Sequence, residues 1–193
     1  VALAAIKSMD FHFPHYEFLM LPGSNGRGAS IRAMLEIANH LSSDLLIFAA
    51  DLVKKQERGL KADWISRLLE PLGLKYDFVL ATYREHYFDN SINSFLVAPL
   101  LECFYGFRID GALSGIYALS QNLVEDLCLE FKFWPEITRS YGIDPWIITR
   151  VMSWNKEMCQ VSLGAKLERF SLEKVNYLFK QIARALFECI KRD

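Results

Sequence analysis

The sequence predicts an α/β fold built on a mainly parallel central sheet. Through the first half of the chain, short apolar runs alternate with segments that carry apolar residues at helical spacing. This order is typical of βαβ units, in which a helix connects two parallel strands. One apolar run, 45–50, shows no polar alternation, as expected of a strand buried on both faces. The second half is less regular, and we expect antiparallel strands to be added near the end of the chain.

The clearest unit lies between residues 16 and 51. A strand is expected over 16–21, followed by a loop with three glycines (Gly23, Gly26 and Gly28) and a helix over 29–41. A second strand over 45–50 ends on the acid Asp51. The helix carries its apolar residues on one stripe, so this face is expected to pack on the sheet. Ligands of parallel sheets bind at the carboxyl ends of the strands, and a site is therefore expected at this edge.

Further elements follow from the same periodicities. A helix over 64–70 is expected to turn Trp64, Ile65, Leu68 and Leu69 inward and to stop at Pro71 and Gly73. A strand over 76–81, a polar loop over 82–93 and a helix over 94–104 come next. Pro99 predicts a kink or a restart in that last helix.

The second half is expected to contain two strands and three helices. A short strand over 115–119 precedes a helix that Ser120 caps and that runs to about residue 129. Asp144 and Pro145 open a helix that runs to Met152, with the proline in the first turn, where its missing N–H is not needed. An edge strand over 159–163 follows. Residues 171–193 form a long amphipathic helix, with Phe179 among its inward residues, which packs on the domain at 1–170 or on a second subunit.

The composition is that of a packed globule, since 52% of the residues are hydrophobic and 13% are aromatic. The formal net charge of −1 gives no reason to expect nucleic acid or an anionic membrane as a partner. The four cysteines are widely spaced, which favours reduced thiols and a cytoplasmic protein over a zinc site. No apolar run reaches the roughly 20 residues of a transmembrane helix, and no signal-peptide pattern is present.

The unit at 16–51 has features that suit a phosphorylated ligand. Glycines let the backbone approach a ligand closely, and the helix that follows offers free N–H groups to phosphate oxygens. Arg27 and Arg32 add positive charge. Asp51 at the strand end could bind a divalent metal that neutralises a diphosphate. Taken alone, the same residues are also compatible with a tight turn before a helix, two solvated arginines and a capping or loop acid.

Two later segments add candidates. The loop over 82–93 combines cationic, amide and aromatic side chains, among them Tyr83, Arg84 and Asn93, which suits an anionic or polyhydroxyl ligand. Asp144 lies at a helix start, where an acid is usually a cap. Trp146 suits either the core or a platform for a sugar face.

These segments occur in an order that resembles a known family. Residues 25–32 (NGRGASIR) followed by 49–52 (AADL) resemble the nucleotide-sugar glycosyltransferases of the GT-A fold, a three-layer α/β/α sandwich. Later segments are similar to glucosyl-3-phosphoglycerate synthases and mannosylglycerate-type enzymes (83–84 with 90–93, 98–101, 111–118, 141–144 and 160–166). The resemblance covers about residues 20–170, and it implies that the first strands of the family fold lie before Val1.

The chain departs from the family pattern at several positions. Ala49 stands where the family has the first acid of its Asp-x-Asp motif, and Ile116 replaces a glutamate. The family's metal-binding histidine is absent, and Glu168 lies at about its place. Arg27 replaces a lysine and keeps the positive charge.

The resemblance implies transfer of a hexose from a nucleotide diphosphate sugar to a small anionic acceptor, with retention of configuration and with Mg²⁺ or Mn²⁺ as cofactor. It assigns the metal to Asp51 and Glu168. Around the metal it implies a donor site formed by Gly26, Arg27, Gly28, Arg32 and Asp51. It implies an acceptor site formed by Tyr83, Arg84 and Asn93. The catalytic residues that it implies are Ser114, Gly115 and Asp144. Ser114 and Gly115 would lie under the sugar, and Asp144 would orient a hydroxyl. A homodimer is compatible with this pattern.

Two alternatives remain open at this point. The losses at Ala49 and Ile116 are also compatible with a sugar-nucleotide-binding protein whose catalytic site has degenerated. A sugar-phosphate nucleotidyltransferase shares a glycine–arginine loop and a related fold. In such enzymes, however, the loop directly follows the first strand and has a downstream lysine. Here an expected helix at 1–9 and the expected strand at 16–21 precede the loop.

Overall fold

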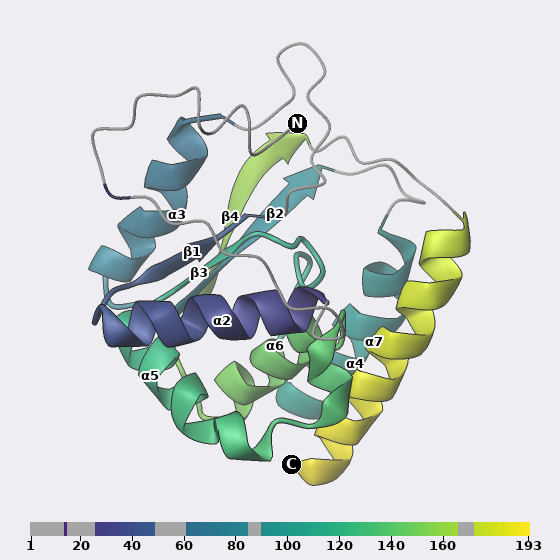
Figure 1. Cartoon of the computed structure of the whole chain (residues 1–193). Coiled ribbons are helices and arrows are strands. Elements are labelled where there is room, and N and C mark those ends of the chain that lie inside the picture. Colours follow the sequence, from purple (N-terminus) through teal and green to yellow (C-terminus); the bar gives the residue numbers. More distant parts are fainter. Residues whose placement is uncertain (1–13, 15–25, 49–60, 85–89, 166–171) are drawn as a thin grey trace.

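The computed structural model describes residue 14 and residues 26–48, 61–84, 90–165 and 172–193. The expected helix at 1–9, the strand at 16–21, the first glycine of the loop (Gly23), Asp51 and Glu168 lie outside these ranges. Within the described residues the order of helices and strands is mixed, as an α/β fold requires (Figure 1). No helix in these ranges is long and apolar enough to cross a membrane.

Four strands form the sheet of the described residues, in the order β1-β3-β2-β4. Their bounds are Leu45–Ile47 for β1, Phe78–Arg84 for β2, Tyr117–Leu119 for β3 and Met158–Ala165 for β4. β3 is antiparallel to both β1 and β2, whereas β2 and β4 are parallel. β1, β2 and β4 therefore run in one direction, which agrees with the mainly parallel sheet that the sequence predicts.

The expectation about the antiparallel strands was only partly right. β3 is antiparallel, but it lies inside the sheet between β1 and β2. β4 lies at the edge, as its alternating sequence predicts, and it is parallel to β2. The local pattern of a strand identifies its faces and its exposure, but direction depends on pairing with residues far away in the sequence.

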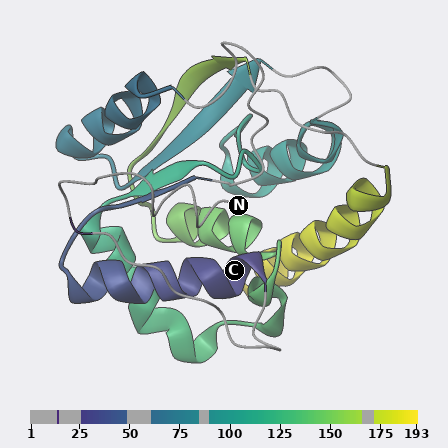
Figure 2. The ribbon, with the colours of Figure 1, turned by 45° about the horizontal axis from the view of Figure 1, so that its top comes forward.

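Helices lie on both faces of the sheet (Figures 1 and 2), and an apolar cluster fills the space on each side. On one face, α3 (Asp63–Gly73) places Trp64 and Leu68 against Val79, Ala81 and Ile116. The other face is covered by the remaining helices, with bounds Arg27–His40 for α2, Ala98–Tyr105 for α4, Gln121–Leu129 for α5, Ile143–Ser153 for α6 and Leu172–Arg192 for α7. Helices on both faces of a sheet give the three-layer sandwich that the sequence predicts.

α3 differs from its prediction at two points. The helix continues past Pro71 to Gly73, because a proline in the last turn removes only one hydrogen bond near the helix end. Ile65 and Leu69 were expected to face inward, but they are 46% and 39% exposed. One stripe at a spacing of four, through Trp64 and Leu68, contacts the sheet, and the neighbouring stripe faces solvent.

β2 is longer than expected, because it continues through residues 82–84, which were assigned to a loop. The expected helix at 94–104 lies within a continuous helical run whose hydrogen-bond pattern changes along it. A π-helical segment at Asn93–Val97 leads directly into α4, and Val97 keeps helical φ and ψ. The helix therefore does not restart at Pro99, which follows the change from the π-helical to the α-helical pattern.

α7 packs on the rest of the molecule, with Ile182, Leu186 and Cys189 in the main core. Phe179, which was expected to face inward, is 49% exposed. At the end of α7, the Asp193 carboxylate accepts hydrogen bonds from Tyr105 (2.5 Å) and Ser153 (2.7 Å). The same carboxylate pairs with Arg150 on α6, so it joins α4, α6 and α7 at one point.

Candidate functional site

The carboxyl ends of β1, β2 and β4 lie at one edge of the sheet, since these strands run in the same direction. β3 runs the opposite way and begins at this edge. Its first residue, Tyr117, is paired with Ile47 at the end of β1 and with Leu80 in β2. The start of β3 therefore lies where the sequence predicts a ligand site.

An ion pair between Arg27 and Asp144 lies next to Tyr117. Arg27 Nε donates to Asp144 Oδ2 at 2.8 Å, and an Arg27 terminal nitrogen donates to Asp144 Oδ1 at 2.9 Å. The same nitrogen is 3.4 Å from the carbonyl oxygen of Gly115. The ion pair thus connects the first residue of α2, the loop before β3 and the first turn of α6.

Asp144 is not a helix cap, although acids at helix starts usually are. The N-cap of α6 is Gly142, and no side chain caps it. Asp144 Oδ1 instead accepts a hydrogen bond from the hydroxyl of Tyr117 at 3.3 Å. Burial and the neighbouring Asp144 charge raise the pKa of Tyr117 well above its ordinary value, although Arg27 opposes this. The phenol therefore remains protonated and acts as the donor to Asp144.

The glycines at the start of α2 make a backbone contact that the sequence does not reveal. A Cβ on Gly28 would lie 1.6 Å from the carbonyl oxygen of Thr138, and one on Gly26 would lie 2.4 Å from that of Arg139. Gly26 also has φ of +153°, which L side chains rarely adopt. In the described structure these two glycines let α2 approach the 3₁₀ segment Glu136–Arg139 closely. Their predicted contact with a donor remains a prediction.

Ser114 and Gly115 shape the turn before β3. Ser114 is 5% exposed, and its hydroxyl donates to the carbonyl of Ile116 at 3.0 Å. Gly115 has φ of +73°, a left-handed conformation that favours glycine. These residues fix the loop whose Gly115 carbonyl faces Arg27.

Arg32 contacts different residues from those that Arg27 contacts. Its guanidinium carbon is 4.4 Å from the centre of the Phe131 ring, and its Nε is 3.4 Å from Glu36. This is a cation–π contact on α2 that stabilises the packing of residues 130–134. That Arg32 binds the donor stays a prediction. Its contacts among the described residues are with Glu36, Phe131 and Trp134.

Tyr83 and Arg84 lie at the end of β2, where successive side chains point to opposite faces. The Tyr83 ring packs on Trp64 of α3, with ring centres 5.6 Å apart. Arg84 is the last residue of β2 and is exposed. Of the two predicted acceptor residues, Arg84 is therefore accessible at the sheet edge, and Tyr83 belongs to the layer under α3.

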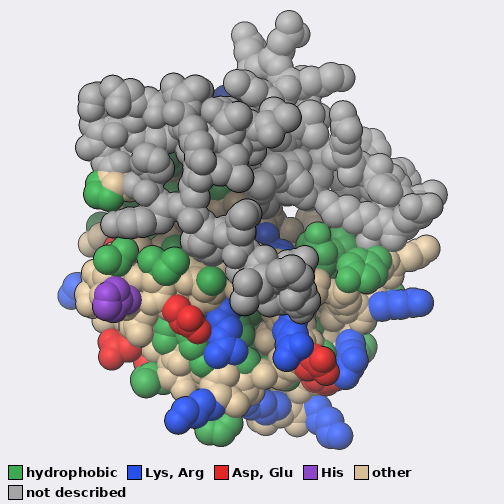
Figure 3. Space-filling model, viewed as in Figure 1, with side chains coloured by type: hydrophobic (Ala, Val, Ile, Leu, Met, Phe, Trp, Pro, Cys, Tyr) green, Lys and Arg blue, Asp and Glu red, His purple; other side chains and the backbone are tan. Residues whose placement is uncertain are grey.

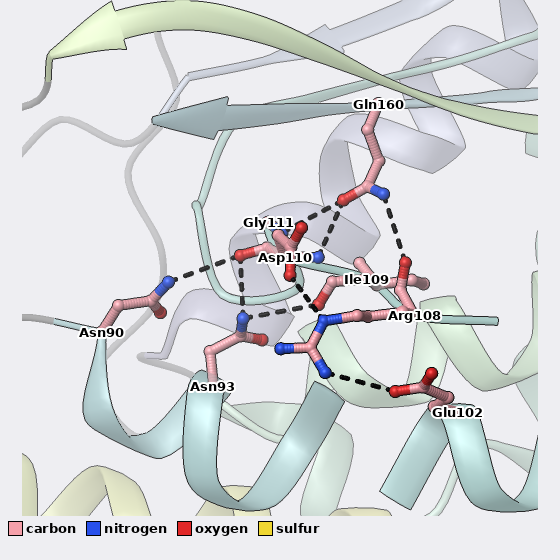
Figure 4. A network of polar contacts seen from close by, with 8 residues as sticks. All are labelled: Asn90, Asn93, Glu102, Arg108, Ile109, Asp110, Gly111 and Gln160. Atoms are coloured by element: carbon pink, nitrogen blue, oxygen red, sulfur yellow. Dashed lines mark hydrogen bonds and ion pairs between the residues drawn. The ribbon is translucent and has the colours of Figure 1, made fainter. Parts of the chain in front are cut away.

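Asn93 holds the loop 108–111 through its side chain (Figure 4). Its amide nitrogen donates to the carbonyls of Asp110 at 2.8 Å and Ile109 at 3.4 Å. From β4, Gln160 Oε1 accepts from the N–H of Asp110 at 2.8 Å and that of Gly111 at 3.3 Å. Asn93 is only 1% exposed, so in this structure it positions the loop and lacks the surface to contact an acceptor.

Replacing Asn93 with alanine should lower the free energy of unfolding by about 1–2 kcal/mol, because the buried contact to the Ile109 carbonyl and the short, partly buried contact to the Asp110 carbonyl would both be lost. Urea denaturation of the variant measures this change. Asn90→Ala is the matched control, since Asn90 makes one longer contact of 3.4 Å to Asp110 at the surface. Equal destabilisation by the two substitutions would contradict the role assigned to Asn93.

Trp146 belongs to the core. It is 1% exposed, and its ring centre lies 4.4 Å from that of Trp134. It also borders a cavity of about 410 Å³ that Ile137, Cys189 and Arg192 help to line. Of the two roles that the sequence suggests for Trp146, the structure supports the core role. Stacking on a sugar would require an exposed ring face, which Trp146 does not have.

The described part of the chain does not supply a metal site or an activated thiol. No group of three His, Cys, Asp or Glu side chains within it could hold a metal ion. The two predicted metal ligands, Asp51 and Glu168, lie outside the described residues. All four cysteines are free, and burial raises the pKa of Cys128 to about 11 and also raises those of Cys159 and Cys189.

Three residues of this region were not identified as positioning residues from the sequence. Tyr117 bonds Asp144, Gln160 holds the loop 108–111, and Thr138 contacts Gly28 through its backbone. The polar Gln160 between two apolar strand residues was the one available signal. The other two contacts depend on which segments the fold brings together.

Charged side chains of both signs are interspersed on the face seen in Figure 3. The described residues on this face form no continuous basic patch of the kind that binds nucleic acid. This view agrees with the near-neutral charge of the chain.

Solved structures provide the comparison with known proteins. Glucosyl-3-phosphoglycerate synthase from Mycobacterium tuberculosis, in complex with Mn²⁺, UDP and phosphoglyceric acid, matches with a TM-score of 0.67 at 19% identity, over 88% of this chain and 56% of that one. The same enzyme with Mg²⁺ and UDP gives a TM-score of 0.68 at 19% identity, over 89% and 57%. A mycobacterial protein matches with a TM-score of 0.66 at 18% identity, over 89% and 54%.

No protein-family model matches the chain, and no curated protein matches it significantly. The chain spans little more than half the length of the solved structures. The likeness extends over nearly nine tenths of this chain, which confirms the fold that the ordered sequence segments predict. The described residues therefore have the GT-A fold of the glucosyl-3-phosphoglycerate synthases.

Proposed function

We propose that the protein is a glycosyltransferase that transfers a hexose from a nucleotide diphosphate sugar to a small anionic acceptor. The observation that carries this proposal is the Arg27 guanidinium, held at the ligand-binding edge of a GT-A fold by Asp144 and Gly115. The neighbours of this fold bind UDP-glucose and phosphoglyceric acid. An arginine in this place suits the diphosphate of such a donor.

The chemistry would be mainly electrostatic. When the bond between the sugar and the diphosphate breaks, negative charge builds up on the departing diphosphate, and Arg27 would stabilise that charge. The exposed Arg84 at the end of β2 would attract the anionic acceptor. In keeping with the family resemblance, we propose that the configuration of the sugar is retained.

We also propose that Mg²⁺ or Mn²⁺ assists the reaction, with Asp51 as the main ligand and Glu168 as the second. Such an ion would neutralise the diphosphate. Asp51 follows β1 in the sequence and Glu168 follows β4, and two strands lie between β1 and β4. At about 4.8 Å per strand, β1 and β4 are about 14 Å apart across the sheet. β4 also continues to Ala165, past Gln160, which is level with the end of β1 at Ile47. Both residues can hold one ion only if the segments after the two strands converge.

Replacing Asp51 with alanine should abolish Mn²⁺-dependent binding of UDP-glucose, because the main metal ligand is removed. Isothermal titration calorimetry of the full-length protein, with and without Mn²⁺, measures this effect. Asp63→Ala is the matched control, since Asp63 lies on α3 and pairs with the exposed Arg67. Unchanged metal-dependent binding in the Asp51 variant would contradict the metal assignment.

Turnover separates the proposal from its alternatives. Release of UDP from UDP-glucose in the presence of phosphoglycerate would support a transferase. Metal-dependent binding without turnover on any acceptor would instead favour a binding protein with a degenerate site, for which the family positions changed to Ala49 and Ile116 are the specific observation. Release of pyrophosphate from a nucleoside triphosphate and a sugar phosphate would identify a nucleotidyltransferase.

A further inference from the structure

The Asp144 carboxylate is almost fully engaged by protein groups. Oδ2 accepts from Arg27 Nε, and Oδ1 accepts from an Arg27 terminal nitrogen and from the Tyr117 hydroxyl. A carboxylate has about four acceptor positions, and three are therefore occupied. Asp144 is 6% exposed and Tyr117 is 2% exposed, so little of either side chain can reach a substrate.

The side chain of Arg27 is also bonded to protein groups, but it is more exposed to solvent. Its side chain is 18% exposed, more than twice the 8% of the Asp144 side chain, so it is the accessible member of the pair. Two parallel N–H···O bonds fix the plane of the guanidinium as well as its position. An arginine that is held in place before binding loses less rotational freedom when a phosphate arrives.

We propose that Asp144, supported by Tyr117, is a positioning residue that orients Arg27 toward the diphosphate of the donor. This inference rests on the proposed function, and it replaces the direct contact between Asp144 and a sugar hydroxyl that the family resemblance implies. The negative charge of Asp144 also offsets the positive charge of Arg27 that a diphosphate would meet. The benefit of Asp144 must therefore come from orientation, and this determines the sign of the expected effects.

Four variants of the full-length protein test this role: Asp144→Asn, Arg27→Met, the double variant, and Tyr117→Phe. We expect Asp144→Asn to raise the dissociation constant of UDP about five- to twentyfold, measured by calorimetry with Mn²⁺. Arg27→Met should have at least as large an effect. The double variant should bind no more weakly than Arg27→Met alone, because Asp144 acts through Arg27. Tyr117→Phe should have a smaller effect in the same direction.

A purely structural role would give a different result. In that case the effects of the Asp144 and Arg27 substitutions on UDP binding would be independent of each other. Steady-state kinetics gives a second readout, since a positioning role should raise the KM for the donor more than it lowers kcat. A fall in kcat with unchanged UDP affinity in Asp144→Asn would mean that Asp144 contacts the sugar directly, and it would overturn the inference.

Tighter UDP binding by Asp144→Asn would also overturn it, since the net charge of Arg27 would then matter more than its orientation. If Asp144→Asn does not fold, Tyr117→Phe provides the test, and unchanged UDP affinity in that variant counts against the inference. Failure of the wild-type protein to bind UDP with Mn²⁺ would overturn the proposed function and this inference together. Normal wild-type binding with no loss in the variants would overturn the inference alone.

Discussion

Replacing Gly28 with alanine should lower the free energy of unfolding by more than about 3 kcal/mol, or prevent folding altogether. The new Cβ would lie 1.6 Å from the carbonyl oxygen of Thr138, 2.7 Å from its carbonyl carbon and 2.9 Å from that of Arg139. All three atoms belong to the backbone, so no rotation of a side chain relieves the overlap. The start of α2 or the segment 136–139 would have to move.

Helix propensity alone predicts the opposite result, since alanine is favoured over glycine in a helix by up to about 1 kcal/mol. Gly73→Ala in α3 is the matched control, because a Cβ there would meet no atom within 4 Å. Thermal and urea denaturation should show Gly73→Ala unchanged or slightly stabilised and Gly28→Ala strongly destabilised. A Gly28→Ala protein as stable as the wild type would refute the close contact with Thr138.

Asp193→Asn should lower the free energy of unfolding by about 2–3 kcal/mol at neutral pH, because it leaves the buried Arg150 without its counter-ion. Arg150 is 5% exposed. Burial opposes the ionisation of Asp193, but the hydrogen bonds from Tyr105, Ser153 and Arg150 outweigh it and lower the pKa of the carboxyl. The ionised form of Asp193 is therefore the form that stabilises the folded protein.

The sign of the pH dependence follows from this shift. A carboxyl whose pKa is lowered by folding contributes its full stabilisation above its ordinary value of about 3.8 and loses it as the pH falls through the folded pKa. The stability difference between wild type and Asp193→Asn should thus be constant from pH 7 to 5 and shrink below pH 4. Urea denaturation at several pH values measures it. Asp63→Asn is the control, and a similar effect there would contradict the assignment.

The architecture could be predicted because it depends on local patterns. The stripe of α2 and the Ser120 cap of α5 are visible in the sequence, and Ser120 accepts from the N–H of Leu123 as expected. Strand directions depend on pairing, as the position of β3 shows, and they were predicted less well. The exposure of Ile65 could not be predicted either, since the sequence of α3 does not show how wide its contact with the sheet is.

The candidate site was predicted in its location more than in its contacts. Arg27 and Asp144 were both identified, but their pairing joins residues that are far apart in the sequence and required the fold. The glycines of the loop were interpreted as a phosphate cradle, and in the structure they also make room for the Thr138 backbone. A glycine is equally suited to a ligand and to a neighbouring main chain, and sequence alone does not distinguish the two.

The strand order has a consequence for the way the protein is made. β1 pairs with β3, whose partner residues are 70 to 74 positions away, and β2 pairs with β4 about 80 positions away. Such distant pairing slows folding, because long loops must close before the contacts form. On the ribosome, β2 leaves the exit tunnel well before β4 is synthesised, so one side of β2 must wait with unpaired backbone groups. We therefore expect the nascent chain to need protection from aggregation until β4 has emerged.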